Sequence, residues 1–165
     1  MTLKERMKQL EAARPQVVAK IASACENATI RAVEKAAELT PPTQNDLRGT
    51  NTRAGEMKQH WATDSKVEPM GVALSGGGTY VTILANDKQY ASYVNDGHRM
   101  DRHFVPGLVI NKESGFLEMN LDGKGGIVVG TKTPYVEGLF MVDAAKEEYK
   151  RVLRQELAHI GEVFD

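Results

Sequence analysis

The chain has 165 residues, 41% of them hydrophobic and 6% aromatic, with a formal net charge of −1 at neutral pH. A charge so close to zero argues against sequence-independent nucleic-acid binding, which needs a basic surface. The one cysteine, Cys25, excludes an internal disulfide framework and a cysteine zinc cluster, and its small apolar neighbours indicate a buried thiol. No charged-then-apolar leader opens the sequence, and no apolar run approaches membrane-spanning length. We expect a soluble protein made in a reducing cytoplasm.

The first 40 residues predict helices. Apolar residues recur there at spacings of three, four and seven, the pattern of an amphipathic helix. Thr2 and Glu5 have the spacing of a capping box at the start. Pro15 predicts a break, because a proline inside a helix removes a hydrogen bond and clashes with the preceding turn, at about 3 kcal/mol. We therefore expect a short helix to Ala13 and a longer one from Pro15 that ends near Pro41.

The next part of the chain predicts a long loop and a hairpin. The stretch from Pro41 to Pro69 is polar with few apolar anchors, so we interpret it as an extended loop with a turn of helix near Gly55–Trp61. Two runs of strand character, Met70–Leu74 and Thr79–Leu84, flank a glycine-rich turn at Ser75–Gly78. This pattern is a hairpin signal.

The last third predicts two further strands and a helix. Phe116–Leu121 and Ile127–Val129 have strand character around a glycine-rich turn at Asp122–Gly126. A helix-period apolar stripe then runs through Tyr135–Leu157, with charged residues on its other side and Thr133-Pro134 at its start.

Together these elements predict an α+β fold. We expect the N-terminal and C-terminal helices to pack on one face of an antiparallel β-sheet, with long loops. The chain reads as one domain spanning residues 1–165, with an extended loop at 41–69 and an inserted hairpin-like segment at 108–126. The predicted core between helices and sheet comprises Ile21, Val33, Val81, Ile83, Leu139, Val152 and Leu153.

The segment Tyr90–Gly107 (YASYVNDGHRMDRHFVPG) is the densest in functional side chains. Such a loop marks either an active site or a contact surface. One candidate is a metal site, since imidazole and carboxylate groups suit zinc or manganese and a metal-bound water suits hydrolysis; its ligands would be Asp96, His98, Asp101 and His103. Against it, all four lie in one segment, and the interleaved Arg99 and Arg102 weaken cation binding. No G-x-S-x-G motif occurs.

Several motifs in order resemble the neck, or tail-completion, proteins of long-tailed bacteriophages. The first is Gly55–Trp61 (GEMKQHW), which follows an N-terminal helix and a proline-containing loop. Then come Tyr90–Arg99 (YASYVNDGHR), Val105–Gly107 (VPG) and a closing helix at Tyr135–Leu157. This order covers most of the chain. The sequence departs from the family at Thr43–Arg53, which is longer than usual, and in the added residues 108–132.

The resemblance implies a non-enzymatic virion protein without a cofactor. Such proteins form a cyclic homo-oligomer, a hexamer, between the head portal complex and the tail tube. The implied partners are further copies of the chain, head-closure or portal-adaptor proteins, and tail-terminator or tail-tube proteins. DNA passes through the lumen without specific binding, and no membrane is involved. The implied location is the virion neck, with the host cytoplasm during assembly.

On this interpretation the polar and aromatic residues make contacts within or between subunits. The interface candidates are Tyr90, Tyr93, Asp96, His98, Arg99, Arg102, His103 and Trp61. We expect Gly97 to adopt a backbone conformation closed to other residues, and Thr43–Trp61 and Leu108–Gly126 to reach neighbouring subunits. We predict no enzymatic activity and no structural metal. Two alternatives stay open: a metal-dependent hydrolase that uses the Asp96/His98/Asp101/His103 cluster, and a monomeric phage-encoded module that binds a host protein.

Overall fold

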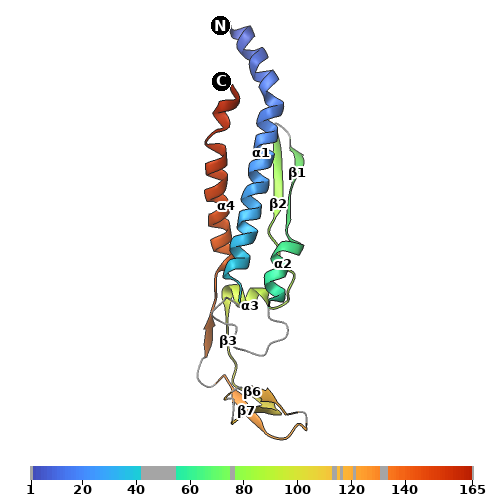
Figure 1. The fold of residues 1–165 in the computed structure, drawn as a ribbon, viewed down its shortest axis with the longest axis vertical. Helices are drawn as coiled ribbons and strands as arrows, with labels where there is room; N and C mark the ends of the chain where they lie inside the picture. Colours follow the sequence, from blue (N-terminus) through green and yellow to red (C-terminus); the bar gives the residue numbers. More distant parts are fainter. Residues whose placement is uncertain are drawn as a thin grey trace. The chain divides into compact units, whose positions relative to one another are not determined.

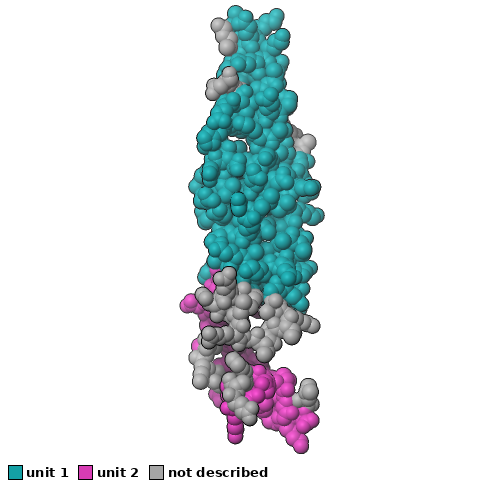
Figure 2. All heavy atoms as spheres, in the orientation of Figure 1, with its two compact units in different colours: residues 1–91, 140–165 teal, residues 92–139 magenta. Residues whose placement is uncertain are grey.

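The computed structural model describes residues 2–41, 55–74, 77–112, 115, 117–120, 122–130 and 134–164. Its contacts group into two compact units, where the sequence predicted one domain (Figure 2). Unit 1 comprises Met1–Ala91 and Phe140–Asp165, and unit 2 comprises Ser92–Leu139. The second unit forms because strands within residues 97–137 pair with one another. The predicted loop residues 42–54 lie outside the described part of the chain.

Helix α1 runs from Leu3 to Leu39 without interruption. The predicted capping box is confirmed, because the Glu5 backbone N–H donates to Thr2 Oγ1 and the Thr2 N–H donates to Glu5 Oε2, at 3.3 and 2.6 Å. The predicted break at Pro15 is wrong, since this residue lies inside α1. Proline has a helical φ, so its cost is local, and strong helix formers such as Leu, Glu, Ala, Gln and Lys surround it.

The hairpin prediction is confirmed, but the preceding segment is more ordered than expected. Strands β1 (Lys66–Leu74) and β2 (Gly77–Ile83) pair antiparallel, with an irregular register between Lys66 and Met70. This irregularity accommodates Pro69, which has no N–H for a ladder. The predicted turn of helix near Gly55–Trp61 is confirmed, since helix α2 covers Glu56–Asp64. The loop predicted up to Pro69 is wrong at its end, where β1 begins at Lys66.

The C-terminal helix is shorter than predicted. Helix α4 covers Met141–Leu157 and is followed by the 3₁₀ helix η1 (Ile160–Phe164). Phe140 has a left-handed φ of 49°, which ends helical geometry before Met141. The residues before it form a strand, so the predicted helix start at Pro134 is wrong. In unit 1, α1 packs against α4, against α2 and against both strands of the β1–β2 hairpin (Figure 1).

The core of unit 1 is built from small residues on α1. Ala24, Ala28, Ala32 and Ala36 recur every four residues and are all buried, which permits close approach of α4 and its buried Ala145. Of the predicted core, Val33 and Val152 are confirmed as buried, and Ile21, Ile83 and Leu153 are half-buried.

The prediction of a core position is wrong for two residues. Val81 is 37% exposed and Leu139 is 45% exposed. Val81 lies in a ladder of two strands, which offers less cover than a wide sheet, and Leu139 belongs to unit 2 and not to the C-terminal helix.

The described residues of unit 2 form one short helix and six short strands. Helix α3 (Ala91–Asp96) leads into the strands β3 (Gly97–Arg99), β4 (His103–Pro106), β5 (Leu108–Ile110), β6 (Leu117–Met119), β7 (Gly126–Val129) and β8 (Tyr135–Glu137). The ladders are β3–β8, β4–β7 and β5–β6, all antiparallel. They nest inside one another, so residues 97–137 form what we call the nested hairpin.

The α+β class is confirmed, with four two-stranded antiparallel ladders in place of one larger sheet. The predicted strand pair on either side of Asp122–Gly126 is wrong, because β6 pairs with β5 and β7 pairs with β4. Within the described residues, no helix has both the length and the apolar character needed to cross a membrane.

Candidate interaction surface

Gly107 joins the two inner ladders of the nested hairpin. Its φ of 75° is in the left-handed region, which favours glycine. Its N–H donates to the Gly125 carbonyl oxygen at 2.9 Å, and its own carbonyl accepts from the Asn120 N–H at 2.7 Å. The chain therefore changes its pairing partner at this residue. Strand β4 before it pairs with β7, and strand β5 after it pairs with β6.

The β5–β6 ladder has one apolar face. Leu108 lies opposite Met119, and Ile110 lies opposite Leu117. Because residues two apart on a strand share a face, these four side chains lie on the same side of the ladder. Ile110, Leu117 and Met119 are 58%, 55% and 61% exposed. We call these four residues the distal apolar face.

The β4–β7 ladder adds a second exposed apolar pair. Phe104 and Val128 are cross-strand partners, and both are exposed. A side chain at Gly126 would overlap the Phe104 ring, so the glycine makes room for it. A two-stranded hairpin alone is at best marginally stable in water, and contiguous exposed apolar patches mark interaction sites. The nested hairpin is therefore the best candidate for a contact surface in the chain.

The predicted Tyr90–Gly107 loop is mostly regular structure, since it contains α3, β3 and β4. Tyr90 is 43% exposed and Tyr93 is 58% exposed. The Tyr93 and His98 rings meet edge to face with centroids 5.7 Å apart, and His98 Nδ1 lies 3.4 Å from the Tyr93 carbonyl oxygen. Two of the interface candidates thus form one aromatic contact within unit 2.

The remaining polar candidates in this segment lie at the surface. Asp96, Arg99, Arg102 and His103 are all exposed. The Asp96 carbonyl oxygen accepts a hydrogen bond from the Tyr135 hydroxyl at 3.2 Å. His103 Nδ1 lies 2.7 Å from the Asp101 carbonyl oxygen. Their exposure leaves these side chains accessible to a partner.

The predicted backbone role of Gly97 is confirmed. Its φ is 80°, and a side chain there would approach the Val136 carbonyl oxygen to 2.6 Å. Only glycine fits both the backbone conformation and the space where β3 meets β8.

The prediction that Trp61 lies at an interface is wrong, because its side chain is in the core and only 3% exposed. Met57 and Trp61 are one turn apart on α2, and both point into unit 1. The indole Nε1–H donates to Thr40 Oγ1 at 2.7 Å, and this hydroxyl donates to the Ala36 carbonyl oxygen at 2.7 Å. Met141 Sδ lies 3.1 Å from the same hydroxyl. The contact links α2 with the end of α1 and the start of α4.

The four candidate metal ligands of the alternative interpretation do not come together. Asp96, His98, Asp101 and His103 are all described, yet their ligand atoms do not come together as a group that could hold an ion. Both histidines face backbone carbonyl oxygens instead. These four residues therefore do not form the ligand group that the hydrolase alternative would use.

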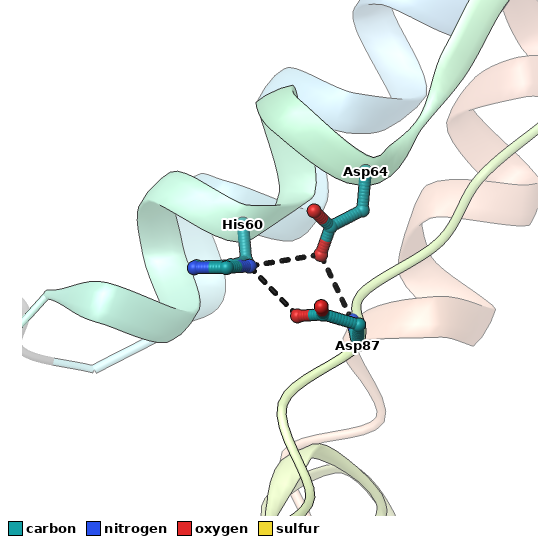
Figure 3. A group of neighbouring side chains, drawn as sticks. All are labelled: His60, Asp64 and Asp87. Atoms are coloured by element: carbon teal, nitrogen blue, oxygen red, sulfur yellow. Dashed lines mark hydrogen bonds and ion pairs between the residues drawn. The ribbon is translucent and has the colours of Figure 1, made fainter.

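One group of potential metal ligands does come together among the described residues: His60, Asp64 and Asp87 (Figure 3). His60 and Asp64 lie one turn apart on α2, and Asp87 follows β2. His60 Nδ1 lies 3.0 Å from Asp64 Oδ2 and 2.8 Å from Asp87 Oδ1. The pKa of the Asp64 carboxyl is lowered to about 2, chiefly because it accepts the Asp87 backbone N–H and also because it faces His60. Sequence analysis missed this group because Asp87 is distant along the chain.

An open groove lies on unit 1 between β2, α1 and α4. Val81 and Leu84 line it from β2 and the residues after it, Ala32 from α1, and Ala145 and Tyr149 from α4. Burial raises the pKa of the Tyr149 hydroxyl, which also faces Cys25 and Thr82. Cys25 itself is buried, as predicted. The apolar lining makes this groove a second candidate contact surface.

Comparisons of the chain with protein-family models, with curated proteins and with solved structures found no significant match. The resemblance to phage neck proteins therefore stays a prediction that rests on the order of the sequence motifs. The geometry of the two candidate surfaces is independent of that resemblance.

Proposed function

We propose that this chain is a structural virion protein that forms a ring at the bacteriophage neck. The ring joins the head portal complex to the tail tube and lets DNA pass. The observation that carries the proposal is the nested hairpin with its exposed distal apolar face. Such a hairpin gains stability when a neighbouring protein covers its apolar side chains.

Ring contacts join two different surfaces of neighbouring copies. The distal apolar face supplies one surface on unit 2, and the groove beside Val81 and Tyr149 supplies another on unit 1. Both are apolar, and they lie in separate units of the chain. We propose that the nested hairpin of one subunit docks against the groove of the next, so that a closed ring covers every copy of both surfaces.

The charge distribution supports a channel that does not bind DNA tightly. Along α4 the ion pairs Asp143–Lys146, Glu147–Lys150 and Glu148–Arg151 place both signs of charge side by side. Together with the net charge of −1, this pattern gives no broad basic surface for phosphates. The proposed partners are head-closure or portal-adaptor proteins on one side and tail-terminator or tail-tube proteins on the other. The proposed activity is assembly, without catalysis.

Replacing apolar side chains on the distal face tests the proposal. Ile110→Asp with Leu117→Asp places two charges on that face, and Lys124→Asp places one on an exposed turn of the same hairpin as a control. We expect the double variant to fold but to be missing from particles, and the Lys124 variant to be incorporated normally. Electron microscopy of purified particles should show the protein as neck density with sixfold or twelvefold symmetry. Its absence from particles, or any other symmetry, would defeat the proposal.

A further inference from the structure

The His60, Asp64 and Asp87 side chains meet at one point of unit 1 (Figure 3). Two of them come from α2 and the third from the segment after β2. One imidazole nitrogen therefore has two carboxylate oxygens within 3.0 Å, at separations of 3.0 and 2.8 Å. This geometry differs from an ordinary surface ion pair, in which one cationic group faces one carboxylate.

One proton at most serves both contacts of His60 in this group. Nδ1 of an imidazole carries a single proton, so its N–H is shared between the two carboxylate oxygens. Asp64 Oδ2 also accepts the Asp87 backbone N–H at 2.9 Å, and Asp87 Oδ1 lies 2.8 Å from His60 Nδ1. An ion with several coordination positions would serve all three groups at once.

The separations of the two carboxylate oxygens from His60 Nδ1 suit a small divalent metal. Bonds of about 2.1 Å at angles near 90–110° place neighbouring ligand atoms roughly 3–3.5 Å apart. The observed separations of 2.8 and 3.0 Å from His60 Nδ1 lie close to that range. A neutral imidazole and two carboxylates also offset the double charge of such an ion, and mixed nitrogen and oxygen donors favour zinc or manganese over calcium.

Neighbouring contacts hold the group in place. The Asn86 side chain donates to the Met57 carbonyl oxygen at 2.7 Å, and the Ala85 N–H donates to Ser65 Oγ at 3.0 Å. The nearest lysine in this segment, Lys88, pairs with Glu56 at 3.3 Å, so its charge is already engaged. Such second contacts fix the orientation of metal ligands.

We propose that His60, Asp64 and Asp87 bind one divalent transition-metal ion of the zinc class. The bound ion cross-links α2 to the segment after β2. Three protein ligands leave a coordination position for water. The proposal does not depend on the ring, since all three ligands belong to unit 1 of a single chain. The proposal departs from the sequence-based prediction of no structural metal, which had weighed the candidate ligands of Tyr90–Gly107 and not this group.

Calorimetry on chelator-treated, full-length protein tests the site. Titration with zinc chloride should show saturable binding of one ion per chain and a higher melting temperature. Asp87→Asn keeps the shape of the side chain and should weaken binding at least about tenfold, and His60→Ala should remove it. His159→Ala is the matched control, because His159 has a single carboxylate partner, Glu162, at 2.8 Å; this variant should bind as the parent does.

Cobalt absorption provides a second readout that does not depend on stability. Cobalt bound at the site should give visible bands of nitrogen and oxygen coordination that disappear in Asp87→Asn, without the intense thiolate bands that binding by Cys25 would give. Three results would overturn the proposal: no saturable binding at zinc concentrations up to about 1 mM, the weak end of ligand affinities; binding unchanged in both site variants; or binding lost equally in His159→Ala.

Discussion

Thr40 should stabilise unit 1 through its hydroxyl, which accepts from the buried Trp61 indole and donates to the Ala36 carbonyl. Thr40 is fully buried and Trp61 is 3% exposed, so water cannot replace either bond. Thr40→Val keeps the shape of the side chain but leaves the indole N–H without an acceptor. An unsatisfied buried donor costs about 1–3 kcal/mol. We expect a loss of that size in the free energy of unfolding.

A double-mutant cycle separates this effect from a change in packing. Trp61→Phe removes the N–H donor and keeps an aromatic ring, at the cost of some ring volume. In the Phe background, Thr40→Val should cost only about 1 kcal/mol, for the lost bond to Ala36. The difference between the costs in the two backgrounds, which measures the coupling of the two substitutions, should therefore be up to about 2 kcal/mol.

Urea denaturation followed by far-ultraviolet circular dichroism measures all four proteins on one scale, since Trp61 is the only tryptophan in the sequence and fluorescence is lost with it. Equal costs of Thr40→Val in the Trp and Phe backgrounds would refute the hydrogen-bond argument. A change in the denaturant slope would mean that compactness changed instead.

Three further outcomes are expected. Pro15→Ala should raise helicity and stability by about 2 kcal/mol, because relief of the interior-proline cost of about 3 kcal/mol is partly offset by a more flexible unfolded chain; unchanged ellipticity at 222 nm would contradict it. Gly97→Ala should speed proteolysis of unit 2 far more than Gly115→Ala, since both glycines have a left-handed φ but only Gly97 is crowded. Asp64 has a folded pKa of about 2, below its unfolded value of about 3.9. The charged Asp64 side chain therefore stabilises the folded protein above pH 4, and this stabilisation is lost as the pH falls through 2. In an acid titration followed by circular dichroism, the stability of Asp64→Asn should fall less steeply with pH than that of the parent protein.

Local patterns predicted the parts of the fold that local interactions determine. The capping box at Thr2, the β1–β2 hairpin and most of α4 follow from spacing within a few residues. The predicted helix break at Pro15 is wrong because the free-energy cost of an interior proline is finite. A long helix with strong helix formers on both sides continues through it.

Pairing between distant segments could not be predicted in the same way. The strands of the nested hairpin are three or four residues long, too short for alternation to reveal a partner. Trp61 is an interface candidate in the sequence, but it is buried because its acceptor, Thr40, lies 21 residues earlier along the chain and is brought to it by the fold. The His60–Asp64 pair is visible as helical spacing, whereas Asp87 follows Asp64 by 23 residues and reaches the site only through the fold.

The number of separate apolar surfaces distinguishes a ring subunit from a monomeric binding module. A monomeric module that binds one host protein needs one exposed apolar patch, and single exposed apolar residues elsewhere carry no meaning. This chain has the distal apolar face on unit 2, the groove on unit 1, and a stripe on α1 in which Leu3, Met7 and Leu10 are 80%, 55% and 44% exposed at helical spacing. A ring subunit between head and tail has two lateral neighbours and two axial ones. Several distinct surfaces are what that position requires, so the distribution of exposed apolar residues favours an assembled protein over a monomeric module.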